Sequence, residues 1–232
     1  MPLLVVIGYG PGNGHAIAQR FGSEGWSVAL IGRNVDRLEV GAARLAETGV
    51  AAHAFPADAS STDSIRAALQ RVHDTLGPIT SVALTAYRSI VVSDVLTADP
   101  RDVAHVFDIG VAGLLTAVQT VLDDLRSADS SSVLVVNGAL GVHDDGIDDY
   151  AVSFGGDGVA LECSAKTKLV GLLAARLRDD GVYVGEIVIN GSIKGSAHAS
   201  PTAIDSADIA DRLWTMAQER TQVHVHVAEQ HP

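Results

Sequence analysis

The sequence predicts a single α/β domain, residues 1–232, built on a doubly wound, seven-stranded parallel sheet with helices on both faces. Three observations support this prediction. Apolar runs of strand length alternate with segments of helical period, as in successive β-α-β units. The strand-like runs are almost continuously aliphatic, as in strands that are covered on both faces. Hydrophobic residues make up 47% of the chain and charged residues 19%, a composition that fills one large core.

Seven segments have the length and composition of strands. Six are apolar runs, and the last alternates polar and apolar residues, which is typical of an edge strand. Because helical segments separate consecutive strands, right-handed crossovers would place the strands parallel in one sheet. In order, the predicted strands are Leu3–Ile7, Val28–Ile31, Val50–Phe55, Thr80–Leu84, Ser132–Val136, Val182–Ile189 and Gln222–Val227.

Segments with helical periodicity lie between these strands. The longest is predicted to begin at Thr97 or Asp99 and to run to about Arg126. By contrast, Asn137–Gly158 is rich in Asp and Gly and is predicted to be an exposed loop that frames a cleft. The other predicted helices are His15–Phe21, Asp36–Glu47, Ser61 or Thr62 to Leu76, Val159–Arg178 and Ser206–Glu219.

Charge and cysteine content limit the partners and the compartment. The formal net charge of −12 would repel nucleic acid and anionic membranes, so neither is expected as a partner. The single cysteine, Cys163, lies in an apolar stretch and is predicted to be a packed thiol. The sequence after Met1 has no basic leader and no obvious membrane-spanning run, so a cytoplasmic location is expected.

A glycine-rich turn follows the first predicted strand and leads into a helix: Gly8-Tyr9-Gly10-Pro11-Gly12-Asn13-Gly14. Backbone amides and the helix dipole meet at such a turn, which favours the diphosphate of a dinucleotide. Gly8 would permit the tight exit from the strand, Gly12 the approach of the diphosphate, and Gly14 the packing of helix on strand. An ordinary strand-to-helix turn is the alternative. The candidate contacts here are Gly8, Gly12, Asn13 and Gly14.

The tip of the second strand reads Gly32-Arg33-Asn34, and in Rossmann-type sheets this tip meets the adenosine ribose. An acidic residue here would bind both ribose hydroxyls. Instead, Gly32 leaves space and Arg33 offers a guanidinium that suits a 2′-phosphate. The sequence therefore favours NADP(H) over NAD(H), with Arg33 and Asn34 as candidate contacts. The alternative is that Arg33 is only a solvated surface charge.

The spacing Gly8-(x)3-Gly12-x-Gly14, Arg33 at the tip of the second strand and later landmarks follow the order of the short-chain dehydrogenase/reductase superfamily. The chain resembles this superfamily over nearly its whole length. The resemblance implies adenine contacts from Asp58 and Ala59 after the third strand, although Asp58 could instead be a helix-start acid. It implies a contact from Ala86 after the fourth strand. After the sixth strand, the backbone of Gly191 and Ile193 would meet the nicotinamide carboxamide.

The resemblance also shows where the catalytic landmarks differ. The family's Tyr-(x)3-Lys corresponds to Glu162-Cys163-Ser164-Ala165-Lys166, so the lysine is kept and the tyrosine is replaced. The family's serine falls within Gly138-Ala139-Leu140, and its middle-helix asparagine falls at Gly110. The chain further resembles a divergent subgroup that lacks the usual tyrosine.

Lys166 and Glu162 are therefore the candidate catalytic residues. The resemblance implies that Lys166 binds the nicotinamide ribose; the alternative is a surface lysine paired with Glu162 one turn earlier. If Glu162 is buried beside the ribose, its pKa could rise enough for it to act as acid or base. The alternative is a purely structural pair with Lys166, because i,i+4 pairs of this polarity are common on helices. More remote proton donors are Tyr87, His143, Asp144, Asp145, Asp148 and Tyr150.

Together, these features predict an NADP(H)-dependent oxidoreductase that moves hydride to or from a small carbonyl, alcohol or imine. The alternative is a non-redox protein with the same fold: a nucleotide-binding sensor, a partner subunit, or an adapted lyase or cyclase. Apolar segments Val103–Leu125 and Val159–Leu177 favour a homodimer or homotetramer. No metal is expected, because His224 and His226 have no evident third ligand.

Overall fold

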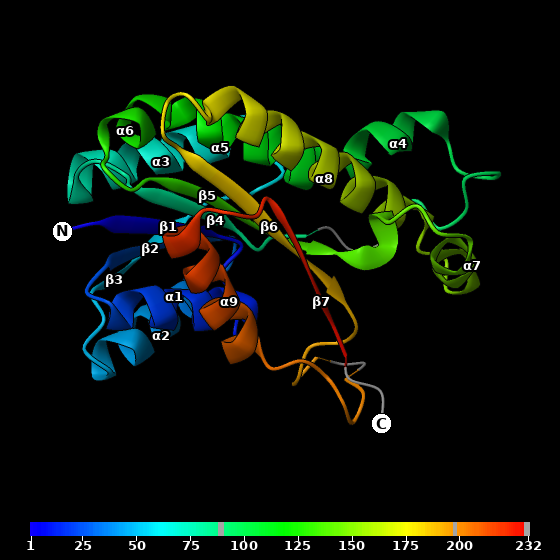
Figure 1. Ribbon diagram of the computed structural model, residues 1–232, viewed down its shortest axis with the longest axis horizontal. Coiled ribbons are helices and arrows are strands. Elements are labelled where there is room, and N and C mark those ends of the chain that lie inside the picture. The colour runs from blue at the N-terminus through cyan, green and yellow to red at the C-terminus, as the bar shows by residue number, and fades with distance from the viewer. Residues whose placement is uncertain (88–90, 197–198, 230–232) are drawn as a thin grey trace.

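The computed structural model describes residues 1–87, 91–196 and 199–229. The described chain forms one seven-stranded sheet in the order β3-β2-β1-β4-β5-β6-β7, and every neighbouring pair is parallel (Figure 1). The predicted fold class is confirmed, and the last strand lies at the sheet edge as expected. The strands are β1 (Leu3–Ile7), β2 (Ser27–Gly32), β3 (Ala52–Pro56), β4 (Ser81–Leu84), β5 (Ser132–Gly138), β6 (Tyr183–Asn190) and β7 (His224–Ala228).

Helices cover both faces of this sheet (Figure 1). One face carries α1 (Asn13–Ser23), α2 (Val35–Glu47) and α9 (Ser206–Glu219). The other carries α3 (Thr62–Leu76), α5 (Leu114–Thr120), α6 (Leu122–Ser127) and α8 (Asp157–Leu177). At one end of the molecule, α4 (Pro100–Val106) and α7 (Asp145–Ser153) project from the body.

Strand β1 shows why the aliphatic runs form a doubly covered sheet. Successive side chains of a strand point to opposite faces. Leu3, Val5 and Ile7 accordingly join the core under α3, α5 and α8, whereas Leu4 and Val6 join the core under α1, α2 and α9. All five side chains are at most 2% exposed. An alternating polar pattern would leave one of these two cores unfilled.

The sheet order reverses between β1 and β4. The chain builds β1, β2 and β3 outward in one direction, then returns to add β4 on the other side of β1. In open α/β sheets, ligands bind in the crevice at the carboxyl ends of the strands beside such a reversal. The glycine turn after β1 and Ala86 after β4 meet at this point.

The predicted helical stretch from Thr97 or Asp99 to about Arg126 is present, but its prediction as one continuous helix is wrong. Asp99 caps α4 by accepting a hydrogen bond from the Arg101 backbone amide, and the segment then breaks into α4, the π-helical segment η1 (Asp108–Gly113), α5 and α6. Glycines in η1 allow the backbone to approach neighbouring segments closely. The stretch Pro100–Thr120 is long and apolar enough to span a membrane, but packed core helices also meet these criteria, so the evidence is weak.

The prediction that Asn137–Gly158 is a loop is also wrong. Strand β5 extends to Gly138, a 3₁₀ turn covers Ala139–Gly141, and α7 follows. The Asp144 side chain caps α7 by accepting hydrogen bonds from the amides of Gly146 and Ile147. Acidic residues in a first turn favour helix as well as solvation, and this is why composition alone was misleading.

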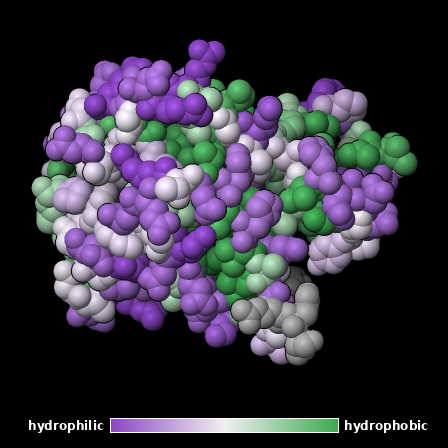
Figure 2. Space-filling view, viewed as in Figure 1, coloured by the Kyte–Doolittle hydropathy of each residue, from purple (hydrophilic) through white to green (hydrophobic). Residues whose placement is uncertain are grey.

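Exposed apolar side chains gather at the end of the molecule where α4 and α7 project (Figure 2). Among the described residues, Leu96 is 91% exposed, Val152 67% and Tyr150 65%. The surface at this end is therefore suited to contacts that exclude water.

Candidate functional site

The glycine turn packs directly against the segment that follows β4. Gly8 has a φ of +96°, and a Cβ on Gly8 would overlap the backbone of Ala86. Gly14 is also confined, because a Cβ there would lie 3.0 Å from the Tyr9 Cα. Gly12 is the residue before α1 and leaves the start of this helix open. The structure thus brings the predicted residues Gly8, Gly12, Gly14 and Ala86 together.

Two unpaired polar atoms at this turn indicate what it could hold. Among the described residues, Asn13 Oδ1 and Ser206 Oγ are buried without a hydrogen-bond partner. A Cβ on Gly12 would lie 3.6 Å from Ser206 Oγ, so the beginnings of α1 and α9 meet here. The first amides of a helix have no partner within the helix and attract anions. These residues fit a dinucleotide diphosphate. Ser206 was missed from the sequence, because nothing local showed that α9 begins beside α1.

The packing of the turn predicts that alanine is tolerated very differently at Gly8 and at Gly10. Gly8→Ala should lower the free energy of unfolding by about 1–3 kcal/mol, because alanine is strained at positive φ and its Cβ overlaps Ala86. Gly10→Ala is the matched control, because a Cβ on Gly10 meets nothing within 4 Å. Urea denaturation of both variants measures the difference, and equal stabilities would contradict the described packing.

Arg33 and Asn34 follow β2 on the same edge of the sheet, and both are exposed. Asn34 Oδ1 accepts a 2.8 Å hydrogen bond from the Arg37 amide and caps α2. This local role occupies the Asn34 oxygen, so Arg33 is the better placed of the two for a phosphate. Their contacts with a cofactor stay predictions.

Asp58 and Ala59 lie just after β3. Asp58 Oδ1 accepts hydrogen bonds from the amide and the hydroxyl of Ser60, at 2.9 and 2.8 Å. The capping residue of α3 is Ser61, not Asp58. A Cβ on Gly113 would lie 2.5 Å from the Ala59 carbonyl oxygen, so η1 packs against this turn. Segment η1 thereby links the predicted adenine side of the site to the pair of Glu162 and Lys166 described next.

Glu162 and Lys166 form a buried pair on α8. Each residue is 2% exposed, and Lys166 Nζ lies 3.9 Å from Glu162 Oε1. The alternative of a surface lysine paired with Glu162 is therefore wrong in its location, although the pairing itself is present. A Cβ on Gly110 would lie 2.5 Å from Glu162 Oε1 and 2.8 Å from Lys166 Cε. Gly110 stands where the family has an asparagine, and because it lacks a side chain, Glu162 and Lys166 occupy the space beside it.

The end of β5, where the family's serine would stand, carries a buried asparagine instead. Asn137 Nδ2 donates to the Cys163 carbonyl at 3.0 Å, to Thr167 Oγ1 at 2.9 Å and to Glu186 Oε2 at 3.1 Å. This buried amide ties β5 to both α8 and β6. Cys163 is buried, as predicted, and burial raises the pKa of its thiol.

A buried carboxylate on β6, Glu186, was not predicted. It is 0% exposed, and its Oε1 lies 2.8 Å from His224 Nδ1 on the adjacent strand β7. A groove of about 810 Å³ opens beside His224 on a different face of α8 from Lys166. It is lined by Gly138, Gly141, Val142, His143, Ser164, Thr167, Lys168, Gly171, Leu172, Val188, His224 and His226. Within the described parts of the chain, no group of three or more His, Cys, Asp or Glu could hold a metal ion.

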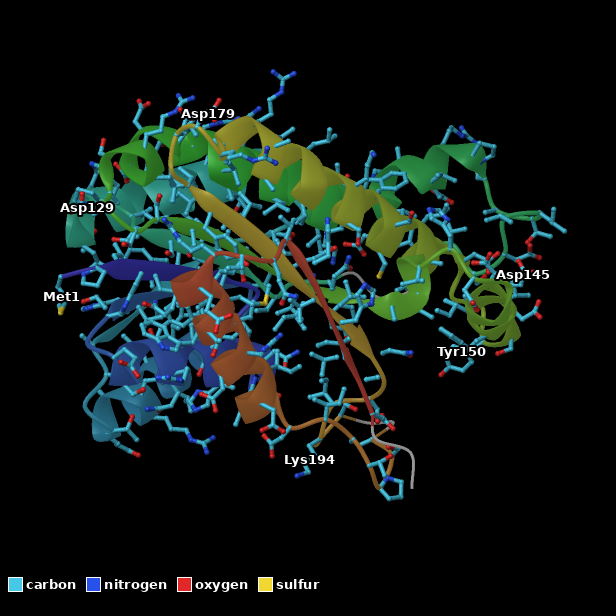
Figure 3. All side chains as sticks on the ribbon, in the orientation of Figure 1. Met1, Asp129, Asp145, Tyr150, Asp179 and Lys194 are labelled. Carbon is cyan, nitrogen blue, oxygen red and sulfur yellow. The ribbon has the colours of Figure 1, made fainter. Side chains whose placement is uncertain are left out.

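The remote proton donors are scattered over other surfaces. Tyr87 is 75% exposed, and His143 lines the groove on the far side of α8. Asp145 and Tyr150 lie on the projecting helix α7 (Figure 3). Asp144 is occupied as the cap of that helix. Glu162 is therefore the candidate acid that the structure places beside Lys166.

A glycine turn at the reversal of a parallel sheet that is covered by helices on both faces defines an α/β protein of the Rossmann type. The chain belongs to the short-chain dehydrogenase family, whose sequence profile matches residues 3–153, more than half of the 232 residues. The resemblance seen in the sequence is confirmed.

Individual relatives are distant. The sulfoacetaldehyde reductase of Chromohalobacter salexigens is 25% identical over 135 residues, which are 58% of this chain and 53% of that protein, so the match spans about half of the relative. The NADPH-bound short-chain oxidoreductase of Pseudomonas aeruginosa with an atypical catalytic centre is 18% identical, with a TM-score of 0.84 over 100% of this chain and 96% of that one. A metagenomic short-chain oxidoreductase in complex with NADP is 20% identical, with a TM-score of 0.82 over 100% and 98%. These likenesses show the fold.

Proposed function

We propose that the protein is an NADP(H)-dependent oxidoreductase that transfers hydride to or from a small carbonyl, alcohol or imine. The observation that carries the proposal is the buried pair of Glu162 and Lys166, 3.9 Å apart, at the position of the family's tyrosine and lysine. Burying two opposite charges is costly unless they are paired and hydrogen-bonded, so such groups mark functional sites. Relatives that carry NADP or NADPH support the choice of cofactor.

The cofactor would lie across the crevice between β1 and β4. The diphosphate would meet the glycine turn, and Arg33 would meet the 2′-phosphate. Asp58 and Ala59 would border the adenine, and the segment after β6 would meet the nicotinamide end. The full set proposed to hold it is Gly8, Gly12, Asn13, Gly14, Arg33, Asn34, Asp58, Ala59, Ala86, Lys166, Gly191, Ile193 and, added from the structure, Ser206.

The chain's own residues would supply orientation and a proton. When bound, a reduced nicotinamide supplies the hydride that reaches the substrate carbon. Lys166 would bind the nicotinamide ribose with its ammonium group. Glu162, ionised and paired with Lys166 at rest, would take up a proton from water and donate it to the substrate oxygen, which returns the carboxylate to its pair with Lys166. The reverse direction moves the same proton back to Glu162.

Turnover and binding measured together test this proposal. We expect NADPH to bind, as detected by its fluorescence, and to be oxidised in the presence of some members of a panel of aldehydes, ketones and imines. Glu162→Gln should retain binding but lower kcat about 100-fold or more, the contribution of a general acid. Tight binding without turnover on any substrate would instead support the non-redox alternative.

Arg33→Ala tests the cofactor preference. Because a charge-assisted hydrogen bond to phosphate would be lost, the Kd for NADPH should rise about 10- to 100-fold, with little change for NADH. Arg66→Ala is a matched control, because Arg66 is an exposed arginine of α3 that pairs with Asp63. Titrations with both cofactors report the result. Equal losses of NADPH and NADH affinity would contradict the phosphate role.

Assembly through α8 is part of the same proposal. Leu161 is 38% exposed and Leu172 54% exposed on this helix. Apolar side chains in these positions are suited to a symmetric contact between two copies of the chain, as a homodimer or a homotetramer would provide. A cytoplasmic location and a small-molecule substrate remain predictions from the sequence.

A further inference from the structure

The carboxylate of Glu229 accepts hydrogen bonds from several hydroxyl groups of the segment that joins β6 to α9, residues 191–205. Glu229 follows β7, and its Oε1 accepts hydrogen bonds from the Ser192 amide and from the Ser192 hydroxyl, the latter at 2.6 Å. Its Oε2 accepts from the hydroxyls of Ser200 and Thr202, at 2.7 and 3.0 Å. A single side chain therefore holds both the outgoing and the returning part of this segment.

The segment is built so that Glu229 can reach it. Gly191 has a φ of +146°, and a Cβ there would overlap the Glu229 side chain. The Glu229 amide donates to the Asn190 carbonyl at 3.1 Å, which extends the β6–β7 pairing by one step. The carboxylate is thus anchored to the sheet on one side and to the segment on the other.

Other contacts also fix the described part of this segment: Ile193 and Ile204 pack with the core under α1, α2 and α9, and the Ser200 amide donates to the Ser192 hydroxyl at 2.9 Å. Its two ends are joined by hydrogen bonds from the Lys194 amide to the Ile204 carbonyl and from the Ile204 amide to the Ser192 carbonyl, both 2.9 Å long. Lys194 also pairs with Asp205 at 3.3 Å, but both side chains are largely exposed. Exposed pairs of this kind contribute little to stability. Glu229 links the segment to the end of β7 through these side-chain hydrogen bonds.

We propose that Glu229 is a positioning residue that holds Gly191 and Ile193 where they meet the nicotinamide end of the cofactor. The inference rests on the proposed function, because it takes those two residues as cofactor contacts. Ser192 lies between them and has both its amide and its hydroxyl bound to Glu229.

The charge of Glu229 suits this role. Hydrogen bonds from Ser192, then from Ser200, lower the pKa of Glu229 to about 2. A depressed pKa means that the bonds favour the ionised form and weaken only as the pH falls through the pKa. This clamp, the Glu229 carboxylate with its hydrogen bonds to Ser192, Ser200 and Thr202, therefore stays charged throughout the neutral range in which an oxidoreductase would be assayed.

Glu229→Gln, made in the full chain, tests the role. Glutamine keeps the shape but replaces one acceptor oxygen with an amide that donates, so one side of the clamp is lost. The Kd for NADPH and the KM for substrate should rise about tenfold, the loss expected for a bond to a charged acceptor, with a smaller change in kcat. Glu219→Gln is the matched control, because Glu219 is an exposed carboxylate in the last turn of α9.

Trypsin provides a readout that does not depend on the cofactor. Lys194 is 64% exposed and lies within the segment (Figure 3). Weakening the clamp should speed cleavage after Lys194 about tenfold, because proteases cut segments that open locally. The Glu219→Gln control should be cut at the rate of the parent protein.

The outcomes separate this role from the proposed function. If NADPH does not bind the parent protein, the proposed function fails and the role of Glu229 fails with it. If NADPH binds the parent and the Glu229→Gln variant equally well, only the positioning role is overturned, even if trypsin cuts the variant faster. Weaker NADPH binding together with faster cleavage supports the role.

Discussion

Lys166→Met is expected to lower the free energy of unfolding by about 3 kcal/mol and to lower kcat/KM about 100-fold or more. The substitution keeps most of the side-chain volume but removes the ammonium group that lies 3.9 Å from Glu162 Oε1. Glu162 is 2% exposed, so its carboxylate would remain in the interior without its lysine. Urea denaturation and NADPH oxidation measure the two effects.

The free energy of unfolding of Lys166→Met should depend on pH in a direction that a simple packing defect does not produce. Protonating Glu162 removes the buried charge, so Lys166→Met should recover stability at about pH 5 relative to about pH 8. Lys168→Met is the matched control, because Lys168 is an exposed lysine on the same helix. A loss of stability in Lys166→Met that is the same at both pH values would refute the electrostatic coupling.

Gly110→Ala is expected to have the second large effect. Its Cβ would lie 2.5 Å from Glu162 Oε1 and 2.8 Å from Lys166 Cε, so the pair must move to admit it. Overpacking of this kind costs about 1–3 kcal/mol, and moving the pair should lower kcat without a comparable change at the glycine turn. Gly110→Asn, which introduces the family's usual residue, should be more damaging than Gly110→Ala.

Two further variants control this experiment. Gly171→Ala on α8 places a Cβ at an ordinary 3.6 Å from His224 Nε2 and should be neutral or stabilising, because alanine favours helix. Combining Gly110→Ala with Glu162→Ala removes the side chain that the new methyl group strikes. The double variant should therefore be more stable than the sum of the single effects predicts. Strict additivity would show that Gly110 and Glu162 do not share space.

Periodicity predicted the strands well because each strand fills two cores at once. All seven predicted strands occur, with ends shifted by a residue or two; the third begins at Ala52 and not at Val50. The break at η1 could not be predicted, since it depends on Gly110 and Gly113 meeting segments that are distant in the sequence. Helix α7 was missed because its acidic residues, typical of a loop, also cap and begin a helix.

The candidate site was only partly visible in the sequence. The spacing of Gly8, Gly12 and Gly14 is local, so it could be interpreted directly. The burial of Glu162 and Lys166 could not, because an i,i+4 pair has the same spacing on a surface and in an interior. Ser206, Glu186 and Glu229 were missed for a related reason: their partners come from other strands and helices, which only the register of the sheet brings near.

The π-helical segment η1 separates two helices that pack against different neighbours. A π turn bonds residue i to residue i+5 and so takes up one residue more than an α turn. Before the turn, α4 packs on α8; after it, α5 packs on α3. Deleting a single residue from Asp108–Gly113 would convert the π turn into an α turn and keep α5 in register, so Val118 would stay in the core. Deleting a residue of α5 before Val118 leaves no extra residue to absorb the change and would turn Val118 away from the core by about 100°, the angular step of an α-helix.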